Sequence, residues 1–170
     1  MNQRNQKQKK VKMDLVSQRR LMLNGNEVVV CTPLGVSRHE LDGKVVSKVD
    51  ERLAAPHHQL LDKDRIALWK NNTREVTIAN LKTAEIEIVL PLDASDIDRI
   101  TSTSTSFMVR YHKGKRVAVF DAKTGQRTHR IQARDVGTKG SAVEDLFPLK
   151  RGAILAFAPY PKGEAFLLDV

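Results

Sequence analysis

Apolar and polar residues alternate along much of this 170-residue chain. The alternation is clearest in EVTIANLKTAEIEIVL, residues 75–90, and in RVAVFDAKTGQRTHRI, residues 116–131, which start 41 residues apart. A period of two places one face of a β-strand in a core, whereas an amphipathic helix repeats its apolar residues every three to four positions. The two stretches therefore predict two copies of one β-hairpin unit.

The correspondence between these copies extends upstream of the two stretches. When Val117 is placed on Val76, Phe107 falls on Ile66, and apolar residues coincide at every second position. Such coincidence is what strands with one buried face require. Self-similarity at a fixed spacing indicates an array of like units.

Two weaker copies flank this pair, at Leu21–Gly35 and Ala153–Val170. Each has an apolar strand followed by a glycine-bearing turn, Asn24-Gly25 in the first and Lys162-Gly163 in the last. Asn and Gly tolerate the positive φ that tight hairpin turns require. The chain is therefore expected to hold four hairpin units.

Further short strands are expected on both sides of each hairpin, whereas the segment with Pro56, His57 and His58 is expected to be a loop. The preceding strands are predicted at Met13–Val16, Lys48–Leu53, Asp96–Ile100 and Ala142–Phe147, and the following ones at Ser37–Leu41, Ala84–Leu90 and Gln126–Ala133. Four antiparallel strands every 41–48 residues predict an all-β fold of β-propeller blades. The blades are expected at about 13–40, 48–90, 96–134 and 142–170, after a basic tail of residues 1–12.

The stretch VAVFDAKTG, Val117–Gly125, resembles the third strand and turn of WD-repeat and related β-propellers. The resemblance implies that Asp121 caps the turn and that Thr124-Gly125 supply the bend before the outer strand. The Gly-His and Trp-Asp pairs of WD repeats are absent, and Asn80 occupies the Asp121 position in the second copy. The chain is expected to carry degenerate WD-repeat-like blades.

The last copy ends at Asp169-Val170, where the preceding copy enters its turn, so the fourth blade is expected to lack its outermost strand. Propellers close their ring because an open sheet edge promotes aggregation. The preferred expectation is the first half of a longer propeller. A four-bladed ring and a partial ring completed by another protein remain alternatives.

Composition favours a globular protein, with 41% hydrophobic and 29% charged residues. No apolar run approaches the length of a membrane helix. The single cysteine, Cys31, lies in the run VVVC and is expected to be a small buried hydrophobe. The net charge of +9 is concentrated in residues 1–20, which carry +6, and residues 110–140, which carry +7. Such asymmetry concerns binding partners rather than fold.

No catalytic or cofactor-binding constellation is recognisable, so a noncatalytic protein without a cofactor or metal is expected. His57-His58 lack a third ligand at zinc spacing. The acidic cluster Asp93, Asp96 and Asp98 lacks the Gly and closing Glu of a calcium loop. The serines at 102, 104 and 106 lack a nucleophile elbow. An enzyme or small-molecule binder that uses a central channel is kept as an alternative, with Asp98, Glu144 and Asp145 as its candidates.

The basic blocks supply the candidate binding residues for nucleic acid or an acidic partner. Lys9-Lys10-Val11-Lys12 matches a short nuclear import pattern. Because Arg127 and Arg130 are three apart on a strand, they are expected to point to opposite faces. Solvated charges that protect an edge strand are the alternative interpretation. The candidates are Lys7, Lys9, Lys10, Lys12, Arg110, Lys113, Lys115, Arg116, Arg127, Arg130 and Arg134.

These observations predict a noncatalytic scaffold whose loop rims bind other protein subunits and RNA. By analogy with WD-repeat subunits, the expected setting is a nuclear or nucleolar ribonucleoprotein complex of the ribosome-assembly type, with the cytoplasm as the alternative location. A protein-binding module that recognises an acidic partner is the second hypothesis. No membrane partner is expected.

Overall fold

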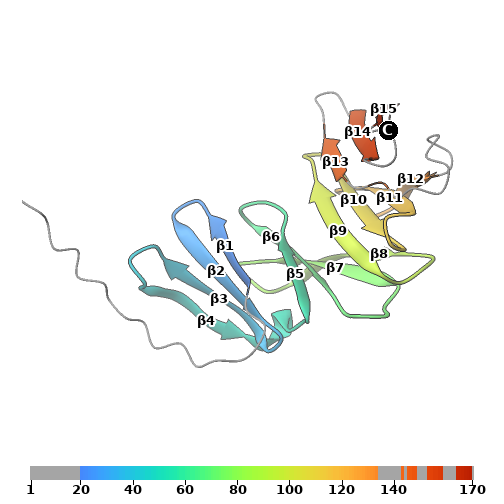
Figure 1. Cartoon of the computed structure of the whole chain (residues 1–170). Helices are drawn as coiled ribbons and strands as arrows, with labels where there is room; N and C mark the ends of the chain where they lie inside the picture. The colour runs from blue at the N-terminus through green and yellow to red at the C-terminus, as the bar shows by residue number, and fades with distance from the viewer. Residues whose placement is uncertain (1–19, 134–142, 144, 149–152, 159–163, 170) are drawn as a thin grey trace, which may run out of the picture.

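The computed structural model describes residues 20–133, 143, 145–148, 153–158 and 164–169, which form four antiparallel sheets in chain order (Figure 1). The first sheet contains β1 (Arg20–Asn24), β2 (Glu27–Thr32), β3 (Gly35–Glu40) and β4 (Val45–Asp50). The second contains β5 (His57–Leu60), β6 (Arg65–Trp69), β7 (Glu75–Asn80) and β8 (Ile86–Pro91). The third contains β9 (Ile97–Ser102), β10 (Ser106–Tyr111), β11 (Arg116–Asp121) and β12 (Arg127–Gln132). The last contains β13 (Asp145–Pro148), β14 (Ala153–Ala158) and β15 (Glu164–Asp169).

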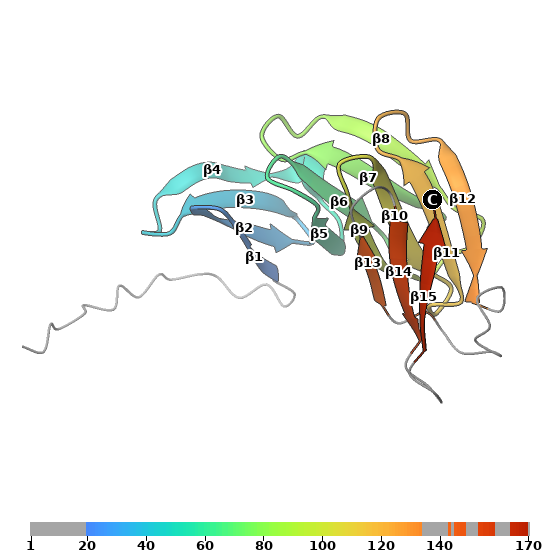
Figure 2. The same cartoon turned by 90° about the horizontal axis from the view of Figure 1, so that it is seen from above.

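The sheets follow one another along an open arc, with the first and last sheets at its two ends (Figures 1 and 2). The first strands of neighbouring sheets are joined by hydrogen bonds between side chain and backbone. The Gln59 side chain of β5 bonds both the N–H and the carbonyl of Ile100 in β9. The Arg20 guanidinium of β1 donates to the His58 carbonyl of β5 at 3.1 Å. Strands β1, β5 and β9 therefore lie along the inner side of the arc.

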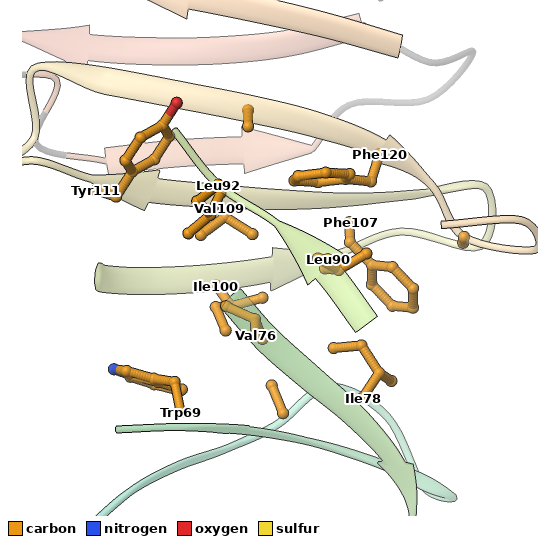
Figure 3. Packing of buried hydrophobic residues seen from close by; sticks show 13 residues of the cluster. Trp69, Val76, Ile78, Leu90, Leu92, Ile100, Phe107, Val109, Tyr111 and Phe120 are labelled. Atoms are coloured by element: carbon orange, nitrogen blue, oxygen red, sulfur yellow. The ribbon is translucent and has the colours of Figure 1, made fainter. Parts of the chain in front are cut away.

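The core lies between sheets because strand alternation gives each middle sheet two apolar faces. On β6, Ile66 and Leu68 pack with the first sheet, whereas Ala67 and Trp69 pack with the third. All four side chains are at most 6% exposed. Burying an aliphatic or aromatic side chain contributes about 1.5–3 kcal/mol. Figure 3 shows the cluster between the second and third sheets, where Phe107 of β10 faces residues of the second sheet.

The third sheet closes its last turn as the family resemblance implied. The Asp121 Oδ1 accepts hydrogen bonds from the N–H of Lys123 at 3.0 Å, the N–H of Thr124 at 2.7 Å and the Thr124 hydroxyl at 2.9 Å. These bonds hold the pKa of Asp121 below its usual value. Gly125 follows at φ +71°, a conformation that glycine adopts without a Cβ penalty. The predicted cap and bend are confirmed.

The second sheet builds the same turn from different residues. The Asn80 Oδ1 accepts from the N–H of Lys82 at 2.9 Å and of Thr83 at 3.1 Å. Ala84 takes the place of Gly125, with φ +57°. In both sheets the pairing of the third strand with the outermost strand shifts register at the equivalent place, between Ile78 and Ala79 of β7 and at positions 119–120 of β11. The predicted equivalence of the two copies therefore extends to their irregularities.

The first two sheets differ from the strand assignment predicted for them. Residues 48–50 end β4, the outermost strand of the first sheet, and Glu51–Leu53 form a 3-10 helix that Asp50 caps. The segment expected to be a loop around His57 and His58 is β5, the first strand of the second sheet. The prediction was one strand out of step because Asn24-Gly25 joins β1 to β2, and turn residues look alike in every hairpin.

The remaining strand predictions have different outcomes. The strands of the third sheet are confirmed within a few residues. The predicted strand Met13–Val16 lies outside the described residues. The last sheet has three strands in the order β13-β14-β15, and its interpretation as an incomplete blade stays a prediction. The predicted burial of Cys31 is confirmed, since it is 1% exposed and burial raises the pKa of its thiol to about 12. In the described part of the chain no helix is long and apolar enough to cross a membrane.

Candidate binding interface on the third sheet

The turn between β10 and β11 presents two of the predicted basic residues to solvent. Lys113 and Lys115 are both exposed. His112, Lys113 and Gly114 all have positive φ, between 55° and 72°. The Asp98 Oδ2 accepts the Gly114 N–H at 2.6 Å, which ties this turn to the first strand of the same sheet. The two lysines therefore project from a turn with a fixed backbone.

Arg110, which precedes this turn, has internal partners. Its Nε lies 3.9 Å from the Asp98 Oδ2, and one of its terminal nitrogens donates to the Val143 carbonyl at 3.4 Å. The side chain is 20% exposed. Arg110 therefore acts in the packing of the third sheet, and Asp98, a candidate for central-channel chemistry, is engaged in the same contacts.

Asp93, in the loop after β8, joins the second sheet to the third. It accepts the Tyr111 hydroxyl at 2.7 Å and forms ion pairs with Arg130 at 2.8 Å and Arg116 at 3.5 Å. Burial opposes ionisation of Asp93, but these three partners outweigh it and hold the pKa of its carboxyl below the usual value. Burial and the bond to Asp93 raise the pKa of Tyr111 to about 12. Two predicted binding arginines thus take part in a contact between sheets.

The outermost strand, β12, carries its arginines on one face, contrary to the expectation from spacing alone. The register shift places Arg127 opposite Phe120 and Arg130 opposite Ala118. Phe120 and Ala118 both pack toward the second sheet. A β-bulge adds one residue to a strand, so residues three apart can share a face. Arg127 and Arg130 therefore form one stripe, and the prediction of opposite faces is wrong.

The predicted basic residues divide into two groups. Arg110, Arg116 and Arg130 contact carboxylates. Lys113, Lys115 and Arg127 are exposed and form no ion pair with another residue of the described part of the chain. The others, Lys7, Lys9, Lys10, Lys12 and Arg134, lie outside the described residues.

The histidines of β5 have structural contacts. The His57 ring stacks on Trp69 with 5.4 Å between centroids, and its Nε2 lies 2.5 Å from the Asn71 Oδ1. His58 is 2% exposed, and its Nε2 donates to the Leu53 carbonyl at 3.1 Å. Burial lowers the pKa of His58. Within residues 20–133 and the described strands beyond, no three His, Cys, Asp or Glu side chains gather as metal ligands would.

Sequence reasoning missed the role of Asp93. The sequence pattern indicated Asp93 only as a member of an acidic cluster with Asp96 and Asp98. The contact with Tyr111 spans 18 residues and joins two sheets, so no local pattern could reveal it. The one available signal was the repeat, which places the third sheet beside the loop that follows the second.

No protein-family model matches the chain, and no curated protein matches it. Similar solved structures include the computationally designed Ika4 protein, at 17% identity and a TM-score of 0.64 over 96% of this chain and 98% of that one. Another is the dihydro-heme d1 dehydrogenase NirN in complex with DHE, at 12% identity and a TM-score of 0.62 over 89% of this chain and 34% of that one. A third is Hsv2 of Kluyveromyces lactis, at 14% identity and a TM-score of 0.59 over 86% of this chain and 42% of that one.

These likenesses establish the fold and leave the family open. The chain has an all-β, propeller-like fold. It spans less than half of the NirN and Hsv2 chains and almost the whole of Ika4. Membership of the WD-repeat family stays a prediction, because neither a family model nor a curated sequence supports it. One of these neighbours is an enzyme, and at 12% identity this carries no activity over to the present chain.

Proposed function

We propose that this chain is a noncatalytic propeller-type scaffold that binds RNA through the phosphate backbone along its third sheet. The observation that carries the proposal is the set of exposed cations Lys113, Lys115 and Arg127, which have no carboxylate partner among the described residues. The chain as a whole carries a net charge of +9. Unpaired cations on a fixed backbone attract a polyanion without first breaking an internal ion pair.

The placement of these cations suits an extended partner. Lys115 lies at one end of β11, and Arg127 lies opposite Phe120 near the other end. At about 3.3 Å per residue, that separation is roughly 15–20 Å, which spans several nucleotides. Phe107 and Phe120 are fully buried, so base stacking on these aromatic rings is not available. The proposed contact is therefore with phosphates and has little sequence preference.

The proposed cellular setting is a nuclear or nucleolar ribonucleoprotein complex of the ribosome-assembly type. It rests on the basic segment Lys9-Lys10-Val11-Lys12 and on the resemblance to WD-repeat propellers. Other protein subunits would contact the remaining loop rims. The noncatalytic part is supported by the acids and histidines described above, since Asp93, Asp98 and His58 are engaged in structural contacts.

The test is a salt titration of binding to a single-stranded RNA oligonucleotide by fluorescence anisotropy. The slope of log affinity against log salt is about −0.7 for each phosphate neutralised on a single strand. The triple variant Lys113→Gln, Lys115→Gln, Arg127→Gln is expected to reduce this slope by about 2 and to weaken binding at 0.1 M salt on the order of 10–100-fold.

The matched control replaces three exposed lysines in or beside the first two sheets that form no ion pair among the described residues, Lys48, Lys63 and Lys70, by Gln. It removes the same charge and is expected to change the slope by less than the first variant does. If RNA affinity and salt slope fell equally in the two variants, the net charge alone would explain the effect, and the assigned site would be contradicted. Tighter binding to an acidic peptide than to RNA, in the same buffer, would replace RNA by an acidic protein as the partner.

A further inference from the structure

The first sheet has an apolar face that none of the other described sheets covers. Leu21 and Leu23 of β1 are 60% and 74% exposed. They pair across the hairpin with Val30 and Val28 of β2, which are half-buried. Directly opposed residues share one face of an antiparallel pair, so these four side chains form one surface. We call it the first-sheet face.

Equivalent positions in the next two sheets are buried. Val28 is the second residue of β2, as Ile66 is of β6 and Phe107 is of β10. Ile66 and Phe107 are both 0% exposed, because each packs against the preceding sheet. The first-sheet face therefore has the residues of an inter-sheet interface at the end of the arc where no preceding sheet is described.

The other end of the array has the complementary feature. Leu167 of β15 pairs with Leu155 of β14, in the register by which Val119 pairs with Met108 and Ile78 with Ala67. Val119 and Ile78 are 1% and 0% exposed because they face the following sheet or segment. Leu167 is 64% exposed. Each end of the array thus exposes one half of a contact that occurs within it.

We propose that the first-sheet face binds the Leu167 face of the last sheet in a second copy of this chain, and that two such contacts close a ring of two chains. The first and last sheets stand at opposite ends of the arc, so the two faces of one chain do not meet (Figures 1 and 2). The chain covers 42% of the Hsv2 chain, so two copies together would cover most of a chain of that length. The proposal is independent of RNA binding.

The joint uses the packing that already holds the sheets together. Between the first and second sheets and between the second and third, a face with Ile66 or Phe107 meets the apolar face of the sheet before it. A second copy offers the same pair of faces. A head-to-tail contact closes when the rotation between copies returns to the start, and here two copies joined twice do so. Closure also removes the exposed apolar surface that would promote aggregation.

The first experiment measures molar mass by size-exclusion chromatography with light scattering. The wild-type chain is expected to be a dimer, and Leu21→Glu with Leu23→Glu is expected to raise its dissociation constant roughly 100-fold or more, since two charges would enter an apolar contact. The control is Ile86→Glu on β8, where the side chain is 64% exposed but lies outside both faces. Circular dichroism checks that all variants fold.

The second experiment separates a head-to-tail ring from other dimers by mixing variants. Leu167→Glu alone is expected to be monomeric, as is the first-sheet variant. A mixture of the two retains one intact pair of faces and is expected to form a heterodimer.

A monomeric wild type at 100 μM, a dimer that survives Leu167→Glu, or dissociation caused equally by Ile86→Glu would each overturn the proposal. Absence of a heterodimer in the mixture would also overturn it. A contact of two first-sheet faces would be recognised by a Leu167→Glu variant that stays dimeric. None of these readouts depends on RNA, so failure here leaves the proposed function to its own test.

Discussion

The second and third sheets have the same geometry, and few of their residues are the same. Asn80 and Asp121 cap equivalent turns, and Ala84 and Gly125 both take positive φ there. Both outermost strands carry a bulge at the same place. The outermost strands differ most, because β8 reads IEIVLP and β12 reads RTHRIQ.

The difference shows which positions the fold constrains. Positions that face a neighbouring sheet accept any apolar residue that fills the space, and turn positions accept any side chain that supplies the same acceptor. The outermost strand faces solvent on one edge and is free to change its charge. Arg127 thus occupies the position in the third sheet that Ile86 occupies in the second. This exchange of an apolar for a cationic residue distinguishes the third sheet as the candidate binding site.

The largest effect is expected from emptying equivalent core positions. Phe107→Ala should lower the free energy of unfolding by about 3–5 kcal/mol, and Ile66→Ala by about 2–5 kcal/mol, because each leaves a cavity between sheets. Phe107 also loses the Arg65 guanidinium, which lies 4.9 Å from its ring centroid. Urea unfolding measures both, with Phe107→Leu as the control that keeps most of the buried volume. A loss of unfolding free energy under about 1 kcal/mol at both sites would contradict the conclusion that these side chains fill the space between neighbouring sheets.

A smaller effect is expected from exchanging the turn residues. Gly125→Ala should cost about 1–3 kcal/mol, since φ is +71° and a Cβ would lie 2.5 Å from the Ile88 Cγ2. Ala84→Gly should change stability by less than about 1 kcal/mol, because relief of its φ of +57° offsets the greater freedom of glycine in the unfolded chain. Thermal unfolding of both variants is the measurement. Equal effects would show that the two turns are under the same steric constraint, which the structure does not support.

Much of the fold could be predicted from the sequence, because strand alternation and turn chemistry are local. The third sheet, with VAVFDAKTG, was predicted within a few residues. The first sheet was assigned one strand out of step, since Asn24-Gly25 does not reveal which hairpin it closes. The candidate basic residues were identifiable by type, but which of the described ones pair with a carboxylate depends on Asp93 and Asp98, which reach them through the fold.

The smallest effect is expected in the pH dependence of folding stability. His58 in the second sheet occupies the position of Ile100 in the third, since they pair with the equivalent residues Leu68 and Val109. Burial lowers the pKa of His58, so the unfolded chain binds its proton more readily. Stability from this group is therefore present above about pH 6.5 and is lost as pH falls toward the folded-state pKa.

Chemical denaturation at pH 7 and pH 5.5 tests this prediction. His58→Ile is expected to lower stability at pH 7 by about 1–3 kcal/mol, because the Leu53 carbonyl loses its donor, and to show a smaller loss between the two pH values than the wild type. His129→Gln, on the exposed strand β12, is the control. An unchanged pH dependence in His58→Ile would show that other groups dominate.

The sequence by itself determined that this chain forms repeated antiparallel hairpins, where its turns bend and which residues are apolar, because alternation and turn propensity act over a few neighbouring residues. Among the described residues, only the tertiary structure decided which strand belongs to which sheet, which cations pair with carboxylates and which apolar faces a neighbouring sheet covers. Those features depend on contacts between sheets, about 40 residues apart along the chain, such as Gln59 with Ile100. Short-range patterns carry no information about such contacts.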